Sequence, residues 1–124
     1  MLVQDGQSVT PGTVLIRIAG NARALLTAER NALNTVQHLS GIATMTAEYV
    51  ALVAHTNAKI CGTRKTTPGV RAVEKYAAGC GGAMNHRFGL DDAFLLKDNH
   101  TAVPAGRPPA FRAARPGGVP PVDV

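Results

Sequence analysis

The longest periodic pattern in the chain runs from Asn21 to Thr56 and predicts a helix. Thr27 is suited to cap this helix, with Glu29 in its first turn. Gly41 lies in the middle of the pattern and allows a division into two helices. The residues around Gly41 are small, which predicts that another element packs closely there. The apolar positions repeat at intervals of three, four and seven, as on one helix face: Leu26, Leu33, Val36, Ala43, Ala47, Val50 and Val53.

A second set of elements follows this stretch. Ala58–Cys61 is typical of a short strand, and the next residues run into Thr-Thr-Pro-Gly, a turn signal. Thr67 is placed to cap a helix, Pro68 suits its first position, and Gly79 suits its end. The apolar spacing of that helix is i, i+3, i+7: Val70, Val73 and Ala77.

Arg64 and Lys65 therefore lie where a predicted strand leads into a helix. No acidic residue occurs in the run from Gly62 to Gly69. In α/β folds the carboxyl ends of parallel strands are where ligands bind. A solvated basic turn is the alternative interpretation, since Lys and Arg are usually exposed.

A further cationic group follows in the next stretch. Glycines on both sides bracket Asn85-His86-Arg87, and the continuous apolar run Ala93–Leu96 is typical of a strand buried in a parallel sheet. That run ends at Lys97. We therefore expect four cationic side chains to converge on one polyanionic ligand, because they would repel one another in an empty site. They are Arg64, Lys65, Arg87 and Lys97.

At the amino-terminal end, Met1–Gly20 alternates short apolar groups with turn pairs, and Val14–Ile18 is typical of a strand. This pattern resembles the end of a small β-rich region. At the other end, residues 107–124 hold five of the eight prolines, which predicts a disordered or adventitious segment.

Composition narrows the class of ligand. The 124 residues carry a net charge of +5, a modest excess that favours a small anionic ligand over nucleic acid. No apolar run is long enough for a membrane span, and no secretory signal is evident. Cys61 and Cys80 have no metal-site spacing, so we expect reduced thiols in a cytoplasmic protein.

Several motifs in order resemble the quinolinate phosphoribosyltransferase family (nicotinate-nucleotide pyrophosphorylase, carboxylating). The resemblance runs from about Asp5 to Gly106 and is shared in part with the ModD-type relatives. The matching segments are Leu25–Asn34, Leu39–Thr44, Thr63–Gly69, Glu74–Ala77, Gly81–Gly82, Asn85–Arg87 and Lys97–His100.

The resemblance implies a reaction and a set of site residues. A phosphoribosyl group would pass from phosphoribosyl pyrophosphate to quinolinate, with loss of carbon dioxide, to give nicotinate mononucleotide for NAD synthesis, with Mg2+ as cofactor. Lys65 and Lys97 would be catalytic. Arg30 would reach into the partner's site in a homodimer. The residues that would bind substrate are Arg30, Thr63, Arg64, Lys65, His86, Arg87 and Lys97.

The resemblance also implies a partial α/β barrel. A full (β/α)8 barrel needs roughly 250 residues, and the chain would hold its first two strands with flanking helices. Residues 1–26 would be the end of a small α/β sandwich domain and residues 27–106 the start of the barrel. Because the family pattern stops at Gly106, residues 107–124 would be a Pro/Arg-rich tail, either disordered or the product of a frameshift. The later strands, with the acidic residues that bind magnesium, would be missing. We therefore expect a truncated fragment without turnover of its own.

Three other interpretations stay open. The chain could be a ModD-like relative with another acceptor, or a non-catalytic remnant that dimerises through the small residues of its long helix. A basic nucleic-acid binder is the third, motivated by an isoelectric point of about 9.8.

Overall fold

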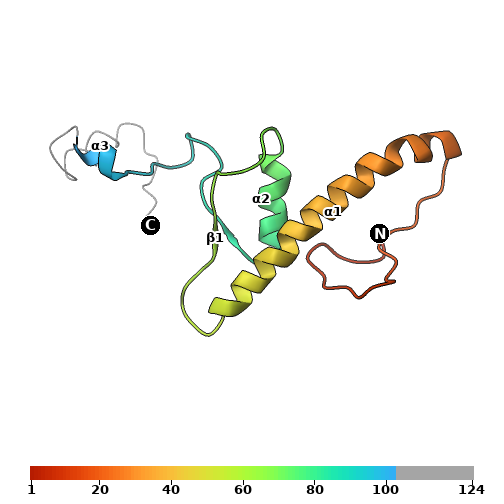
Figure 1. Ribbon diagram of the computed structural model, residues 1–124, viewed down its shortest axis with the longest axis horizontal. Helices are drawn as coiled ribbons and strands as arrows, with labels where there is room; N and C mark the ends of the chain where they lie inside the picture. The colour runs from red at the N-terminus through yellow and green to blue at the C-terminus, as the bar shows by residue number, and fades with distance from the viewer. Residues whose placement is uncertain (103–124) are drawn as a thin grey trace. The chain divides into compact units, whose positions relative to one another are not determined.

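The structure, a computed structural model, describes residues 1–102, so the predicted tail from Arg107 lies outside it. The chain divides into two compact units, Met1–His86 and a second that begins at Arg87, and each is described by itself. The elements in chain order (Figure 1) are α1 (Ala22–Val53), β1 (Cys61–Gly62), α2 (Arg71–Cys80), β2 (Met84–Asn85) and α3 (Asp98–Ala102).

Helix α1 is a single helix of 32 residues. It begins after Asn21, whose side-chain oxygen accepts a hydrogen bond from the backbone N–H of Ala24 at 3.2 Å. The predicted cap at Thr27 is therefore wrong, because Asn21, earlier in the chain, already provides the acceptor. Thr27 lies inside the helix and donates its hydroxyl to the Arg23 carbonyl. Gly41 does not interrupt the helix.

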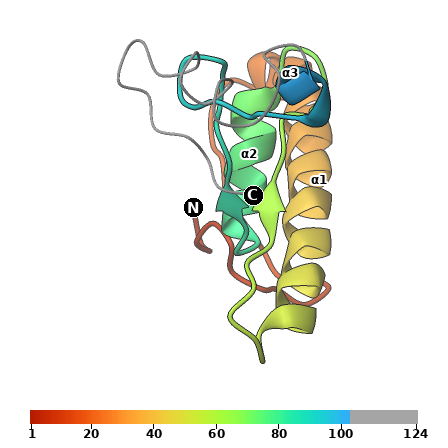
Figure 2. The same cartoon turned by 90° about the vertical axis from the view of Figure 1, so that its left-hand side faces the viewer.

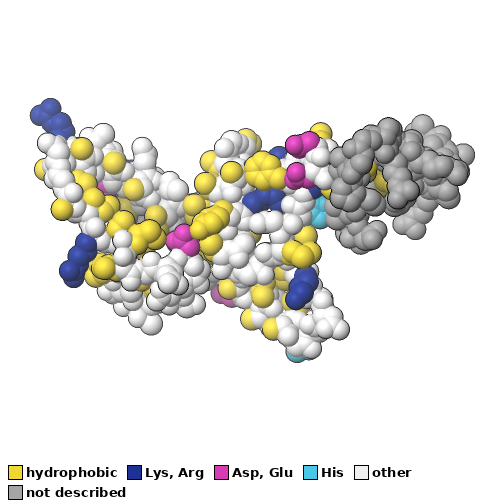
Figure 3. Space-filling model, turned by 180° about the vertical axis from the view of Figure 1, so that it is seen from behind, with side chains coloured by type: hydrophobic (Ala, Val, Ile, Leu, Met, Phe, Trp, Pro, Cys, Tyr) yellow, Lys and Arg dark blue, Asp and Glu magenta, His cyan; other side chains and the backbone are white. Residues whose placement is uncertain are grey.

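The apolar face of α1 is covered only along part of its length. Figures 1 and 2 show α2 beside the carboxyl-terminal half of α1, where Val50 and Val53 are half-buried. In the other half, Leu26 and Val36 remain exposed, and no residue of α1 is fully buried. Apolar side chains accordingly show on the surface in Figure 3. The helical period was predicted correctly, but the amino-terminal half of the predicted face remains exposed.

The close approach expected near Gly41 occurs at Ala43 and Thr46. Gly81, at the end of α2, is buried there, and a Cβ on Gly81 would lie 2.6 Å from Cβ of Thr46 and still closer to the Ala43 carbonyl oxygen. Only a residue without a side chain fits at this crossing. The end of α2 thus docks on α1 at Ala43 and Thr46, and not at Gly41 itself.

The two strands are parallel and adjacent, with Cys61 opposite Met84 and Gly62 opposite Asn85. The Met84 N–H donates to the Ile60 carbonyl at 2.8 Å. A parallel pair with helices confirms the α/β class. Two strands do not show a barrel, so the partial barrel stays a prediction.

The partner of β1 differs from the prediction. The second strand was expected at Ala93–Leu96, but this run contains only a bridge residue, Phe94, and no regular strand. The Ala93 carbonyl instead accepts a hydrogen bond from Nη1 of Arg87 at 2.8 Å. Strand β2 forms earlier because Gly82, with φ of 92°, turns the chain back directly after α2.

Helix α2 begins later than predicted, at Arg71, and Val70 is its N-cap without a side-chain bond. Thr67 is therefore not the cap. Its backbone N–H donates to Oε2 of Glu74 at 3.0 Å, which holds Thr67 in the preceding loop. Gly79 lies within the helix, and Gly81 is the C-cap.

The amino-terminal segment contains no strand, so the prediction at Val14–Ile18 is wrong. A hydrogen bond from the Leu2 N–H to the Leu15 carbonyl joins its two arms. A strand needs a row of such partners, and the described residues provide no row here. The segment is attached to α2 through Asp5, whose carboxylate accepts the Tyr76 hydroxyl at 2.7 Å.

The hydrogen bond between Tyr76 and Asp5 predicts that the Tyr76 hydroxyl titrates at an unusually alkaline pH. The bond to Asp5 raises the pKa of Tyr76 from 10.0 to about 12. Because the folded pKa is raised, the stabilisation is full below pH 10 and is lost as the pH rises through 12. The sequence contains two tyrosines, so the Tyr49→Phe variant leaves Tyr76 as its only tyrosine, and phenolate absorbance then reports the titration of Tyr76 alone. Adding Asp5→Asn should lower the midpoint towards 10.0, and an unchanged midpoint would contradict the contact.

Candidate anion-binding site

The carboxyl ends of β1 and β2 lie at one edge of the sheet. Because the strands are parallel and in register, Thr63 follows β1 and His86 follows β2 at that edge. His86 donates its backbone N–H to the Gly62 carbonyl at 3.3 Å, which extends the pairing to the edge itself. Two of the predicted site residues are therefore brought to neighbouring positions.

Arg64 carries the clearest sign of a missing partner. Its side chain is half-buried, and among the described residues its Nε is a buried side-chain nitrogen without a hydrogen-bond partner. A buried donor without an acceptor is costly, and more so on a charged group. A guanidinium is built to bind a carboxylate or phosphate through parallel N–H groups. Arg64 is therefore suited to an anionic ligand at the end of β1.

Lys65 lies beside Arg64 and is exposed. Its backbone N–H donates to Oγ1 of Thr63 at 3.3 Å, so the threonine hydroxyl shapes the turn that presents the lysine. No acidic residue occurs from Thr63 to Val73 in the sequence. This segment therefore offers two adjacent cations to a ligand.

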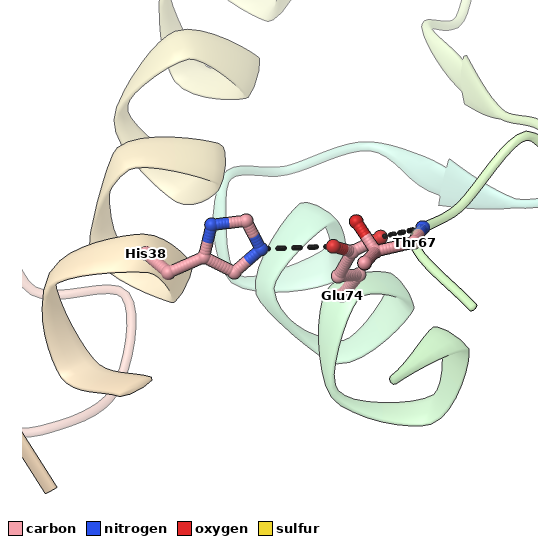
Figure 4. A network of polar contacts seen from close by, with 3 residues as sticks. All are labelled: His38, Thr67 and Glu74. Carbon is pink, nitrogen blue, oxygen red and sulfur yellow. Dashed lines mark hydrogen bonds and ion pairs between the residues drawn. The ribbon is translucent and has the colours of Figure 1, made fainter. Parts of the chain in front are cut away.

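A polar network ties this segment to both helices (Figure 4). Oε1 of Glu74 accepts a hydrogen bond from Nε2 of His38 on α1 at 2.8 Å, and Oε2 accepts the Thr67 N–H. These bonds, the one from His38 first, lower the pKa of Glu74 from 4.5 to about 2. The carboxylate is ionised at neutral pH and fixes the loop to α2. Sequence reasoning missed His38, since no local pattern pairs it with a residue 36 positions away.

Lys75, next to Glu74 in the chain, is hydrogen-bonded to the end of β2. Its side chain is buried and its Nζ donates to the backbone carbonyl of His86 at 3.0 Å. The amide of Asn85 donates in return to the Lys75 carbonyl at 3.2 Å. Helix α2 thus holds the end of β2 as well as the segment after β1.

The remaining predicted site residues belong to the second unit or to α1. Arg87 and Lys97 belong to the second unit, where Nη1 of Arg87 donates to the Ala93 carbonyl and Lys97 is exposed just before α3. The units are described separately, so convergence with Arg64 stays a prediction. Arg30 is exposed on α1, and its role toward a partner subunit also stays a prediction.

The Glu74 network predicts a pH dependence. Because its folded pKa is lowered, the ionised carboxylate contributes its full stabilisation above pH 4.5 and loses it as the pH falls to about 2. Urea unfolding should show wild type more stable than Glu74→Gln at neutral pH, with the gap closing over that acid range. A gap that does not depend on pH would contradict the network.

Within residues 1–102, no three His, Cys, Asp or Glu side chains gather in a way that could hold a metal ion. None of the described helices is long and apolar enough to cross a membrane.

Two protein-family models together match nearly the whole chain. The model of the quinolinate phosphoribosyl transferase N-terminal domain matches residues 1–40, and that of the C-terminal domain matches residues 42–119. The two models meet within α1. The domain boundary at residue 26 stays a prediction.

Relatives give the same result. The chain is 58% identical over 100 residues to a probable nicotinate-nucleotide pyrophosphorylase (carboxylating) from Synechocystis sp., covering 81% of the chain and 34% of the relative. It is 51% identical over 113 residues to the nicotinate-nucleotide pyrophosphorylase (carboxylating) of Mycobacterium leprae, covering 91% of the chain and 40% of the relative.

Solved structures agree. The crystal structure of NadC from Streptococcus pyogenes is 50% identical and superposes with a TM-score of 0.86, covering 91% of the chain and 40% of that structure. The chain therefore spans well under half the length of the relatives it matches. With family models matched over residues 1–40 and 42–119, the chain belongs to the quinolinate phosphoribosyltransferase family.

Proposed function

We propose that this chain provides the quinolinate-binding part of an enzyme that transfers a phosphoribosyl group. Phosphoribosyl pyrophosphate would donate the group to the ring nitrogen of quinolinate, with loss of pyrophosphate and carbon dioxide, to give nicotinate mononucleotide. The observation that carries the proposal is the buried, unpartnered Nε of Arg64 at the carboxyl end of β1. The names of the relatives support the same reaction.

The chemistry of the substrate fits the residues present. Quinolinate carries two carboxylates on neighbouring ring atoms, so its site needs more than one cationic group. Arg64 offers a planar fork and Lys65 a compact charge beside it. Thr63 and His86 lie at the same edge. These groups would hold two anionic substrates against their mutual repulsion and stabilise the charge that shifts as pyrophosphate departs.

The other parts of the site rest on the family resemblance. Arg87 and Lys97 would complete the carboxylate site, with Lys65 between the dicarboxylate and the phosphoribosyl donor. Arg30 would reach the partner's site in a homodimer. Magnesium would accompany the donor, but the described residues hold no suitable cluster of ligands, so none is assigned to it. We expect no turnover from the chain alone. We also expect the protein to be located in the cytoplasm.

Calorimetric titration tests the proposal. We expect quinolinate to bind the chain more tightly than nicotinate, which has the same ring with one carboxylate. Equal affinity for the two would favour a ModD-like acceptor site. Binding of neither, with an intact helical signal and a dimer in sedimentation, would favour a non-catalytic remnant. Binding of DNA or RNA that weakens with salt would favour the nucleic-acid interpretation.

A further inference from the structure

Two neighbouring charged residues of α2 are buried. The exposed fractions of Glu74 and Lys75 are 8% and 6%, and they are the charged residues buried within the described part of the chain. Buried charges are costly unless they are paired or hydrogen-bonded. Each of these side chains makes its bonds to a different segment, so the pair calls for an explanation beyond packing.

Glu74 holds the segment that follows β1. Its carboxylate accepts the Thr67 N–H, two residues after Lys65. The same segment is fixed by Nε of Arg71, which donates to Oγ1 of Thr66 at 3.1 Å. His38 in turn holds the other oxygen of Glu74 and orients the carboxylate (Figure 4). The backbone that carries Arg64 and Lys65 is therefore set by α2.

Lys75 holds the residue that follows β2. Its Nζ donates to the His86 carbonyl, and the Asn85 side chain closes a second link to the Lys75 backbone. A lysine can reach this carbonyl because its aliphatic stem packs within the protein while its ammonium finds an acceptor. The position of His86 relative to α2 is therefore set by Lys75.

We propose that Glu74 and Lys75 are positioning residues that fix the spacing between the segments after β1 and β2, and so select a dicarboxylate over a monocarboxylate. This inference rests on the proposed function. A ligand with two carboxylates gains from two groups of donors only if their separation is fixed in advance. A monocarboxylate needs only one group of donors, so its affinity does not depend on the separation between the two groups. Loosening either segment should therefore cost quinolinate more than nicotinate.

The readout is the ratio of the dissociation constants for nicotinate and quinolinate, measured on the full chain. Partial unfolding weakens both ligands equally and leaves the ratio unchanged, so the ratio separates positioning from stability. We expect Glu74→Ala and Lys75→Met each to lower the ratio about tenfold, the equivalent of one charge-assisted hydrogen bond. Glu74→Gln and Lys75→Arg keep an acceptor or a donor and should retain most of the ratio.

Glu48→Ala and Lys59→Met are matched controls, because both side chains are exposed and their loss changes the net charge by the same amount. They should leave the ratio unchanged. The proposal is overturned if the Glu74 and Lys75 variants keep the wild-type ratio, or if the controls lower it as much.

A second measurement keeps this inference separate from the proposed function. If the wild-type chain binds no quinolinate, the proposed function fails, and amide hydrogen exchange then decides the positioning roles. Glu74→Ala should speed exchange at Thr67, and Lys75→Met at His86, with α1 unaffected. Faster exchange throughout the chain, or none at these two amides, would overturn the positioning roles.

Discussion

Replacing Arg64 with Met is expected to weaken quinolinate binding by about 10- to 100-fold, the range for losing one or more hydrogen bonds to a charged group. The expected loss follows from the buried Nε of Arg64, which has no acceptor within the described residues. Met keeps most of the aliphatic volume and removes the donors. Titration calorimetry with quinolinate measures the change directly.

Two further variants make this result specific. Arg23→Met removes the same charge from an exposed position on α1 and should leave the affinity nearly unchanged. Arg64→Lys keeps the charge but not the planar fork, so it should recover only part of the loss. If Arg23→Met weakens binding as much as Arg64→Met, net charge attracts the ligand and no site at the end of β1 is needed.

Replacing Gly81 with Ala is expected to destabilise the fold by about 1–3 kcal/mol, the usual range for overpacking. The new Cβ would lie 2.6 Å from Cβ of Thr46, and closer still to the Ala43 carbonyl oxygen, which belongs to a helix backbone that cannot move aside. Gly81 has φ of −78°, a conformation that Ala adopts freely. The expected loss is therefore steric, and urea unfolding should show a lower midpoint.

Gly41→Ala is the matched control on the partner helix. Nothing lies within 4 Å of a Cβ at this position. Ala is favoured over Gly inside a helix by up to about 1 kcal/mol, so this variant should be more stable than wild type. Loss of stability at Gly41 together with tolerance at Gly81 would show that α2 docks on α1 in another way.

The sequence predicted features that depend on local chemistry. The helix around Gly41 was recognised from its apolar period, and the segment Gly62–Gly69 from its turn residues and its paired cations. These features follow from spacing within one segment. Close packing was expected around Gly41, but it occurs at Ala43 and Thr46, and nothing lies within 4 Å of a Cβ on Gly41 itself.

Features that depend on distant contacts were missed. Strand β2 was not predicted, because Met84 and Asn85 carry no alternating pattern and pair only through the neighbouring Cys61–Gly62. The apolar run at Ala93–Leu96 has a stronger strand pattern. In the structure, however, the Ala93 carbonyl accepts a hydrogen bond from the Arg87 side chain. Pattern alone cannot show which segment reaches the edge of β1.

The same limit applied to capping and to the polar network. Thr67 has the right chemistry for a cap, but Glu74 binds its backbone from inside the helix. His38 gave no local signal, since its partner lies 36 residues away. The motif containing Glu74 and Lys75 was recognised as a family feature, while the bonds that give it a role became visible only in three dimensions.

We propose that the carboxyl ends of β1 and β2 form a site for quinolinate. Titrating an isotopically labelled chain with quinolinate, and following its backbone amide resonances, tests this claim most directly. We expect saturable shifts at Thr63, Arg64, Lys65 and His86, with the segment before α1 unchanged. No shifts at these residues, or shifts confined to another part of the chain, would contradict the claim.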